Sequence, residues 1–501
     1  MPVTRNYRGT PVRKRRLAAA ALAAIVLLAG CATAPPYQPP AIDLPQSYKE
    51  AGATPAHPGG PANLSAVWWG VYGDDDLDTL EARIDVSSQT LRKAVALWQD
   101  ARAQVRVARS AYFPTVSAGV SVSNSHTSAN VAGKSLAGKT TPDHTLGLTA
   151  SWEPDLFGRI GNTVDAAQAH AEASADDVAA VRLGLQAELA TDYFGVRSLD
   201  REAALLQRTI DTYTSVLELV TNRYRGGIAT QGDVAQARAQ LESTRAQLSD
   251  LQLNRAQLEH AIATLVGESA SRFSLPPLQA DTPAAHLPVV PAAVPSQLLE
   301  RRPDIASAER RVAAANAQVG VARAAFFPDL ILALGGGLES TNLAGWLTAP
   351  SRFWAIGPAL VGTILDGGRR RANADSARAQ FDASAADYRQ TVLHAFQEVE
   401  DGYAAVQALQ NEAASQQAAS EASAEALRMG IDRYRKGAVA YLEVGVLEGA
   451  ALASDRALEN VRRRQLVASV SLVKALGGGW EPAGQATARD GTRAVAAAPA
   501  P

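Results

Sequence analysis

The chain has 501 residues, a formal net charge of -2, a single cysteine and 6% aromatic residues. Because positive and negative charges nearly balance, the composition excludes the broad basic surface of a nucleic-acid-binding protein, and the lone cysteine excludes an internal disulfide. The length allows two or three ordinary domains, and the abundance of alanine favours long, closely packed helices.

Residues 1–30 have the pattern of a bacterial lipoprotein signal peptide. A basic stretch, Arg13–Arg16, precedes an apolar run, and the tetrapeptide Leu-Ala-Gly-Cys then ends at Cys31. Such signals present their cysteine for lipidation, so we expect an acylated, palmitate-bearing Cys31. The alternative is an ordinary secretory signal with a chance cysteine. By analogy with other lipoproteins, Ala32 after the cysteine favours sorting to the outer membrane.

Residues 31–66 are rich in proline, glycine and small residues, which predicts an extended tether rather than a packed element. The first structural repeat is predicted over 67–266. It opens with helices that continue, with a break near Ser87, as far as Tyr112. No later run approaches the ~18 apolar residues of a membrane-spanning helix.

Two β-hairpins are predicted, at about 115–153 and at about 329–364. After Pro114, valine and alanine alternate with serine and glycine, which is the period of a strand. The return run and both runs of the second hairpin follow the same alternation. Pro358 falls inside the last run, and we expect a bulge there because proline cannot donate to a ladder.

A long helical hairpin is predicted after each β-hairpin. Residues 158–225 and 367–436 contain no proline, so each run predicts one helix on the order of 100 Å long. A turn with glycine follows, and a shorter helix returns to Val266 in the first case and to Leu476 in the second.

Two sequence echoes indicate an internal two-fold repeat. ARAQVRVARSAYFP, Ala101–Pro114, recurs as ANAQVGVARAAFFP, Ala315–Pro328, with ten of fourteen positions identical. NRYRGGIATQGDV from Asn222 likewise aligns with DRYRKGAVAYLEV from Asp432. The second repeat is therefore expected over 301–476.

The segments outside the two repeats have different compositions. Residues 267–300 contain many prolines and are expected to form an equatorial connector, whereas 477–501 are expected to form a disordered tail. Each predicted strand has roughly ten residues, apolar on one face and small or polar on the other. That pattern fits a tilted transmembrane β-strand, and it also fits a soluble sheet with one hydrated face. Four strands cannot close a barrel by themselves.

The chain resembles the TolC-like outer-membrane efflux channels, in particular their lipoprotein branch in RND-type tripartite pumps. The resemblance rests on PSQLLERRPDIASAERRVAAANAQVGVARAAFFP, Pro295–Pro328, on WEPDLFGR, Trp152–Arg159, and on the paired Arg-Tyr-Arg turns. It implies an α+β membrane protein and a homotrimer, in which a 12-stranded transmembrane β-barrel is continued by a long periplasmic α-helical barrel.

The resemblance also implies a function. It predicts a passive exit channel in the outer membrane of a Gram-negative bacterium, without cofactor or enzymatic activity, served by a periplasmic adaptor and an inner-membrane transporter. The alternative is a lipid-anchored periplasmic adaptor or coiled-coil scaffold, which would share the long helical hairpins. Two hairpins with a lipid-facing side favour the channel, because an adaptor has no use for them.

In the family that this chain resembles, the tip of the helical barrel is a closed gate, where tyrosines and arginines tie neighbouring helices together and an acidic ring narrows the pore. The matching positions are Tyr434 and Arg435 at the ties and Glu443 in the acidic ring. Their counterparts in the first repeat are Tyr224 and Asp233.

Two departures from the family pattern concern this gate. Val446 stands where a second acidic residue is common, and Val439 stands where an arginine occurs. The alternative interpretation is that tyrosine and arginine cap and pack an ordinary helical hairpin. His394 and Glu398 have the spacing of a metal-binding pair, but no third ligand is nearby, so a solvated helix face is the better interpretation.

Overall fold

The fold is that of a computed structural model of the chain. It describes residues 36–51, 67–131, 133, 135–278, 286–288, 299 and 301–480. The signal peptide, Cys31, most of the connector and the residues after 480 lie outside the described residues, so the expectations for them remain predictions. The chain divides into two compact units: the first comprises Met1–Pro40, Trp98–Ala173 and Ala308–Tyr388, and the second comprises Ala41–Leu97, Ser174–Ser307 and Arg389–Pro501.

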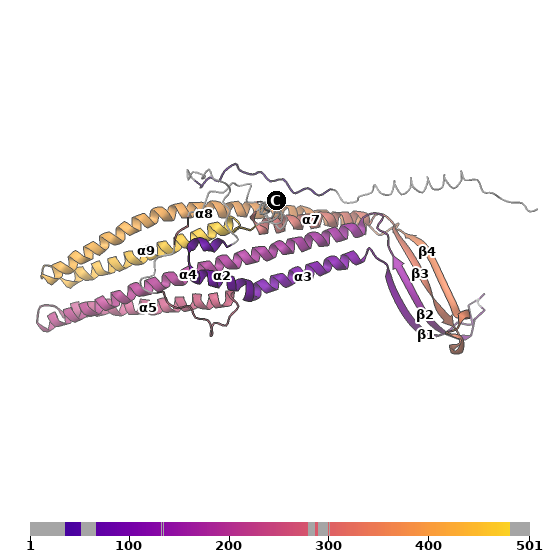
Figure 1. The fold of residues 1–501 in the computed structure, drawn as a ribbon, viewed down its shortest axis with the longest axis horizontal. Coiled ribbons are helices and arrows are strands. Elements are labelled where there is room, and N and C mark those ends of the chain that lie inside the picture. Colours follow the sequence, from indigo (N-terminus) through magenta and orange to yellow (C-terminus); the bar gives the residue numbers. More distant parts are fainter. Residues whose placement is uncertain are drawn as a thin grey trace, which may run out of the picture. The chain divides into compact units, whose positions relative to one another are not determined.

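The first unit contains one four-stranded antiparallel sheet in the order β1-β2-β3-β4, whose strands lie side by side in Figure 1. Its strands are β1 (Thr115–His126), β2 (Thr140–Trp152), β3 (Asp329–Ser340) and β4 (Arg352–Val361). The 3-10 turns η2 (Leu343–Gly345) and η3 (Ala349–Ser351) lie between β3 and β4. Pairing of β2 with β3 joins the two halves of the chain, with Ala150 opposite Leu334.

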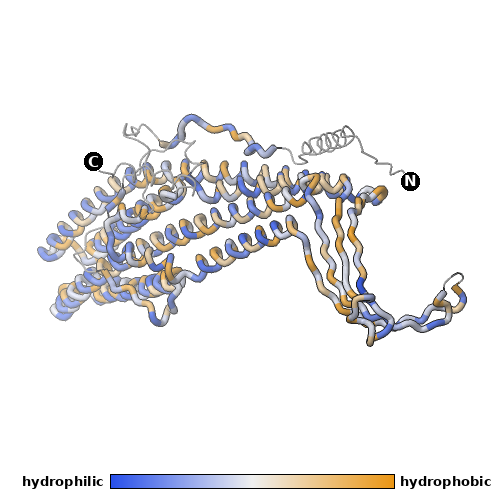
Figure 2. Tube along the Cα trace, turned by 45° about the vertical axis from the view of Figure 1, so that its right-hand side comes forward, coloured by the Kyte–Doolittle hydropathy of each residue, from blue (hydrophilic) through white to orange (hydrophobic). Residues whose placement is uncertain are grey.

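Cross-strand pairing collects the apolar side chains on one face of this sheet. Directly opposed residues of an antiparallel ladder point to the same side. Val116, Ala150, Leu334 and Ile356 are paired in succession, so they form an apolar row across all four strands. Figure 2 shows the strands mainly in orange and white, so strongly hydrophilic residues are few along them. Ile356 is 71% exposed and Trp354 on the same face is 77% exposed, so this face lacks a cover within the described chain.

Pro358 does not form the bulge that the sequence predicts. The ladder between β3 and β4 is continuous, and Pro358 lies directly opposite Leu332. Within the single chain β4 is the last strand of the sheet, so one of its sides carries no ladder bonds there, and such a strand tolerates proline.

An aspartate shortly before each of the two long helices, α4 (Arg159–Arg225) and α8 (Arg369–Arg435), caps the start of the helix. Each helix has 67 residues. The Asp155 carboxylate accepts hydrogen bonds from the backbone N–H groups of Ile160 at 3.1 Å and Gly161 at 2.6 Å. Asp366 accepts from the N–H of Arg370 at 3.2 Å in the same way. These carboxylates satisfy N–H groups that have no partner within the helix and stabilise its positive end.

The helices α3 (Gln89–Ser110) and α7 (Pro303–Ala324) lead into the strands, and each has 22 residues. Both end in a turn before a Phe-Pro pair: the N–H of Phe113 donates to the carbonyl of Ser110, and the N–H of Phe327 donates to that of Ala324, both at 3.0 Å. Proline then prevents the helix from continuing.

The core of the second unit forms around η1 (Trp68–Tyr72) and α2 (Asp75–Ser87). Trp68, Tyr72 and Ile84 are buried there against residues of α4, of α5 (Gln231–Leu265) and of α9 (Tyr441–Ala475). The Tyr72 ring lies 4.9 Å from that of Phe194, and its hydroxyl is hydrogen-bonded to Ser469 at 2.8 Å.

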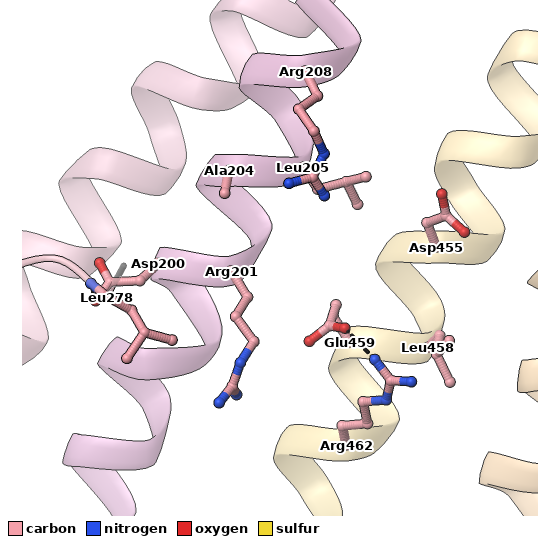
Figure 3. Close-up of a pocket in the computed structure, with 10 residues that line it drawn as sticks. All are labelled: Asp200, Arg201, Ala204, Leu205, Arg208, Leu278, Asp455, Leu458, Glu459 and Arg462. Carbon is pink, nitrogen blue, oxygen red and sulfur yellow. Dashed lines mark hydrogen bonds and ion pairs between the residues drawn. The ribbon is translucent and has the colours of Figure 1, made fainter. Parts of the chain in front are cut away.

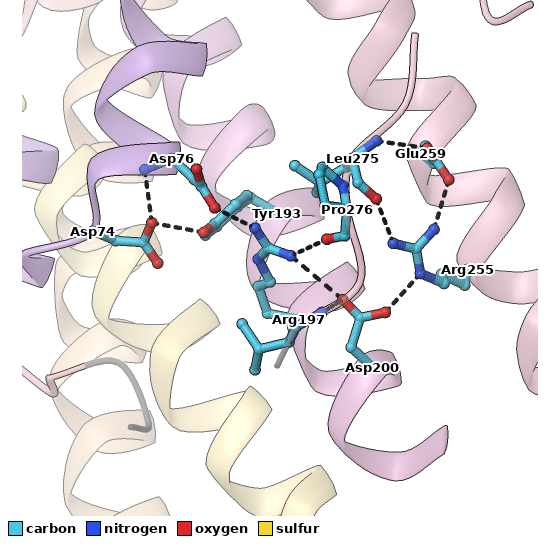
Figure 4. A network of polar contacts seen from close by, with 10 residues as sticks. Asp74, Asp76, Tyr193, Arg197, Asp200, Arg255, Glu259, Leu275 and Pro276 are labelled. Atoms are coloured by element: carbon cyan, nitrogen blue, oxygen red, sulfur yellow. Dashed lines mark hydrogen bonds and ion pairs between the residues drawn. The ribbon is translucent and has the colours of Figure 1, made fainter. Parts of the chain in front are cut away.

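A polar network holds the start of the connector in this unit (Figure 4). Arg197 of α4 is buried and donates to Asp76 at 2.6 Å and to the carbonyl of Pro276 at 2.7 Å. Asp200 accepts from Arg197 at 3.4 Å and from Arg255 of α5 at 2.6 Å. A buried charge is tolerated only when it is paired, so these contacts fix α2, α4 and α5 together.

The Arg-Arg-Pro-Asp motif before α7 has a structural role in the same unit. Arg302 is buried, donates to Asp304 at 2.7 Å and to Glu398 of α8 at 2.6 Å, and also donates to the carbonyl of Ala475 at 3.1 Å. Gly477 lies just after the end of α9 and has φ 94°. A Cβ at this position would lie 2.0 Å from the carbonyl oxygen of Arg301, so a side chain does not fit there. Glu398, which the sequence predicts on a solvated helix face, is half exposed and forms an ion pair with Arg302.

The described part of the tether differs from the unpacked segment that its composition predicts. Tyr48 is buried, with its ring 6.3 Å from Phe396 and 5.8 Å from Tyr403 of α8. The carboxylate of Glu400 accepts from the backbone N–H groups of Lys49 at 2.7 Å and Glu50 at 2.8 Å. The hydroxyl of Tyr37 also donates to the Glu309 carboxylate, so aromatic residues anchor a stretch in which proline had suggested a free linker.

The same order of elements occurs twice along the chain: a helix of 22 residues, two strands, a helix of 67 residues and a helix of 35 residues. Among the described residues, no helix combines the length and the apolar character that crossing a membrane requires.

Candidate functional site

The long helices α4 and α8 both end in Arg-Tyr-Arg and turn through a glycine into α5 and α9. Gly227 has φ 74° and Gly437 has φ 76°, a region in which an L side chain is strained. The N–H of Ile228 donates to the carbonyl of Arg223 at 2.8 Å, and the N–H of Ala438 donates to that of Arg433 at 2.9 Å, so both ends are capped alike.

Tyr434 lies at the centre of a small apolar cluster at these turns. It is 6% exposed, and its ring meets that of Tyr441 edge to face at 5.9 Å. Val220 of α4, Ala237 of α5 and Val444 of α9 complete the buried set. The cluster contains residues from all four long helical segments, so it holds the two helical hairpins together at this end.

Arg223 of α4 adds polar contacts to this cluster. Its guanidinium lies 4.4 Å from the centre of the Tyr434 ring, within the range of a cation–π interaction. The same group donates to the carbonyl of Tyr434 at 3.1 Å and to that of Arg435 at 3.2 Å. Since these carbonyls lie at the negative end of α8, a positive side chain stabilises them.

The two acidic residues predicted at the gate have different surroundings. Asp233 belongs to a capping box at the start of α5. Its carboxylate accepts a hydrogen bond from the backbone N–H of Thr230 at 2.8 Å, and the Thr230 hydroxyl accepts one from the backbone N–H of Asp233 at 3.2 Å. At the start of α9 the residue that corresponds to Thr230 is Ala440, whose side chain cannot cap the helix. Glu443 instead accepts from Arg433 at 2.9 Å, with both side chains half exposed.

The structure therefore brings together only part of the predicted site. Tyr434 and Arg435 meet Arg223, whereas no described contact joins Asp233 or the side chain of Tyr224 to Tyr434. Tyr224 is 44% exposed. Within the described residues there is no group of three or more histidine, cysteine or acidic residues placed to hold a metal ion.

A separate cavity of about 300 Å³ lies between α4 and α9 in the second unit (Figure 3). Arg201 and Arg208 line it from α4, and Asp455, Glu459 and Arg462 line it from α9. Arg462 donates to Glu459 at 2.6 Å, and Asp455 accepts from Ser420 at 2.5 Å. The acids are thus paired locally, and the mixed charge of the wall favours neither anions nor cations.

The family of the chain follows from comparison with known proteins. Residues 83–268 and 294–478, which include both copies of the repeated helices and strands, match the family model of outer membrane efflux proteins. The chain belongs to this outer membrane efflux protein family. It is the exit channel of an efflux system in the outer membrane of a Gram-negative bacterium.

Relatives of this efflux protein are matched over nearly their whole length. The cation efflux system protein CusC of Escherichia coli O6:H1 is 32% identical, with 91% of this chain and 97% of the relative covered. The outer membrane protein OprJ of Pseudomonas aeruginosa is 31% identical, with 94% and 97% covered. The solved outer-membrane channel OprN is 28% identical with a TM-score of 0.83, and 90% of this chain and 100% of OprN are covered.

These findings confirm the resemblance predicted from Pro295–Pro328 and favour the channel over the adaptor alternative. The α+β fold class is confirmed as well. Reasoning from the sequence missed two residues of the candidate site in this efflux protein, Arg223 and Tyr441. A signal for Arg223 was present, because it aligns with Arg433 in the repeat, but only the structure shows that one arginine reaches across to α8 and the other pairs with Glu443.

Proposed function

We propose that three copies of this efflux protein close one 12-stranded barrel, which is continued by an α-helical barrel across the periplasm. The observation that carries the proposal is the four-stranded sheet itself. Its outer strands β1 and β4 each leave one edge unpaired, and hydrocarbon does not tolerate unpaired backbone groups. Four strands are too few to close, whereas twelve enclose a lumen.

The two faces of the sheet support an assignment of sides. The apolar face with Ile356 faces lipid, and the opposite face, where Ala355 lies, is rich in small residues and lines the pore. In this arrangement residues 67–266 and 301–476 are the two structural repeats, joined by the connector 267–300. The twelve strands form a passive duct, and the protein needs neither a cofactor nor an enzymatic step.

A matched pair of arginine substitutions on β4 tests this assignment. Ile356→Arg places a charge in lipid, at a cost of about 2 to 4 kcal/mol per chain near the bilayer centre, whereas Ala355→Arg places it in water. We expect Ile356→Arg to reduce the yield of crosslinked trimers in membranes and Ala355→Arg to leave it unchanged. Equal yields in both variants, or monomers only in the unmodified protein, would contradict the barrel.

The gate is proposed at the cluster around Tyr434. Contacts of Tyr434 and Arg435 with Arg223 keep the hairpin ends together, and Glu443 with Asp233 supplies negative charge near the pore axis, with Tyr224 beside them. Support comes from the burial of Tyr434 and from the half-exposed Glu443 carboxylate.

The partners are proposed from the family. A periplasmic adaptor and an inner-membrane transporter deliver the substrate, and lipidation at Cys31 anchors the mature chain to the outer membrane. Co-purification of the protein with a crosslinked adaptor from intact cells tests the first point, and mass spectrometry of the N-terminal peptide tests the second.

A further inference from the structure

Glu448 on α9 is a buried acid that the candidate gate contacts do not use. Glu448 is only 1% exposed to solvent. Oε2 accepts a hydrogen bond from the Tyr441 hydroxyl at 3.1 Å, whereas Oε1 has no partner. No ion pair reaches it from the described residues. An ionised carboxylate in this position is destabilised, because burial removes water and no positive charge replaces it.

The groups that face Glu448 are neutral phenols. Tyr441 comes from its own helix. Tyr213 comes from α4, is 3% exposed, and its hydroxyl also has no hydrogen-bond partner. Tyr434 of α8 lies behind Tyr441. Burial raises the pKa of Tyr213 to about 12; Gln240 of α5 acts to lower it, and the charge of Glu448 adds a smaller increase.

The surrounding packing connects Glu448 to three helices. Tyr213 packs against Leu241 of α5 in one apolar cluster, Tyr441 packs in the Tyr434 cluster, and α5 and α9 lie in contact. A charge that appears at Glu448 therefore appears in the seam between α9 and the hairpin of α4 and α5. In a seam of this kind the least costly response is local opening, which readmits water to the carboxylate.

We propose that Glu448 is a proton-binding site: when protonated it allows α9 to pack against α4 and α5, and when it loses the proton this contact loosens.

The direction of the pH effect follows from the burial. Desolvation raises the pKa of Glu448 to about 7, even though the hydrogen bond from Tyr441 acts to lower it. In the opened segment the carboxyl has its ordinary value of 4.5. Between these values the opened segment is ionised and the packed one is not, so the packing is strongest at low pH. It weakens about tenfold for each pH unit up to about 7 and is constant above that.

Local hydrogen exchange measures this packing directly. The full-length protein in lipid nanodiscs is exchanged between pH 5 and pH 8, and rates are corrected for intrinsic exchange. Peptides covering 441–452 are compared with peptides covering 458–475 of the same helix. We expect protection of the first set to fall about tenfold per pH unit up to about pH 7, while the second set does not change.

Three variants separate the proposal from its alternatives. Glu448→Gln keeps the shape and removes the charge, so protection is expected to be independent of pH. Tyr441→Phe removes the donor to the ionised form, so the fall is expected to extend above pH 7. Glu421→Gln, an exposed acid on α8, is the matched control and retains the unmodified profile. A flat profile in the unmodified protein, or the same slope in Glu448→Gln, would overturn the proposal. Should Glu448→Gln fail to fold, an unshifted profile in Tyr441→Phe would overturn it independently.

A consequence for conduction rests on the gate proposed above, whereas the proton site itself does not. If the gate is correctly placed, the open probability of channels in planar bilayers rises over the same pH range. A pH-dependent exchange profile with unchanged conductance would leave the proton site in place and contradict the gate.

Discussion

Removal of the Arg223 side chain is the sharpest test of the proposed gate. Arg223→Ala eliminates one cation–π contact with Tyr434 at 4.4 Å and two hydrogen bonds to carbonyls at the end of α8. The contact with the ring contributes about 1 kcal/mol in a half-exposed setting. The hydrogen bonds together contribute about 1 kcal/mol after screening by solvent. The total of about 2 kcal/mol corresponds to a roughly 30-fold shift from tied to untied hairpins in each chain.

The assay is single-channel recording in planar bilayers, with trimers verified before reconstitution. We expect Arg223→Ala to raise the open probability, and Arg223→Lys to have an intermediate effect because lysine keeps the charge but loses the planar fork. Arg225→Ala is the matched control, because Arg225 lies on the same turn and its side chain makes no hydrogen bond, ion pair or cation–π contact within the described part of the chain. In a double-mutant cycle, Tyr434→Leu combined with Arg223→Ala should be less than additive. Identical recordings for Arg223→Ala and Arg225→Ala would show that the contacts of Arg223 do not hold the hairpin ends together.

Three further predictions concern the acids and the lipid anchor. Glu443→Gln should lower cation selectivity in the same recordings, because it removes negative charge near the pore axis; unchanged selectivity would leave Glu443 only as the partner of Arg433. Cys31→Ser should abolish acylation seen by mass spectrometry yet leave trimers in the membrane fraction, since the barrel buries more apolar surface than acyl chains do; loss of all trimers would show that the lipid is needed for assembly. Burial, and after it the charges of nearby acids, raises the pKa of Glu81 to about 9, so its contribution to stability is lost as pH rises from about 4.5 to about 9. Glu81→Gln should therefore flatten the decline of the apparent melting temperature over that range, and parallel curves for both proteins would contradict this.

At the candidate site, the alignment of the two turn sequences no longer predicts the contacts. Asp233 and Glu443 occupy corresponding positions, and so do Arg223 and Arg433. The residue at the helix start is one of the differences between the two turns: it is Thr230 in the first and Ala440 in the second. Thr230 forms a capping box with Asp233, and Arg223 donates to carbonyls of α8. Ala440 offers no cap, so Glu443 pairs with Arg433.

The elements and their order follow from the amino-acid sequence, because they depend on local periodicity. Alternation with a period of two marks strands, and long alanine-rich runs without proline mark α4 and α8. The family follows from the sequence as well, because the motif at Pro295–Pro328 is one uninterrupted run of residues that can be recognised without the structure. The packing of the tether could not be predicted from its composition, because Tyr48 is buried by aromatic residues of a helix some 350 positions later in the chain.

Which side chains of different helices meet at the ends of the long helices follows from tertiary packing. The contact of Arg223 on α4 with Tyr434 on α8 depends on the relative rotation and stagger of these helices. Helical periodicity fixes the face on which a residue lies, but it leaves open which neighbour that face meets. Glu448 shows this limit: Val444 and Leu452, about one helical turn away on either side, place it on an apolar face of α9, but the sequence does not show what covers that face. Burial of this face raises the pKa of Glu448.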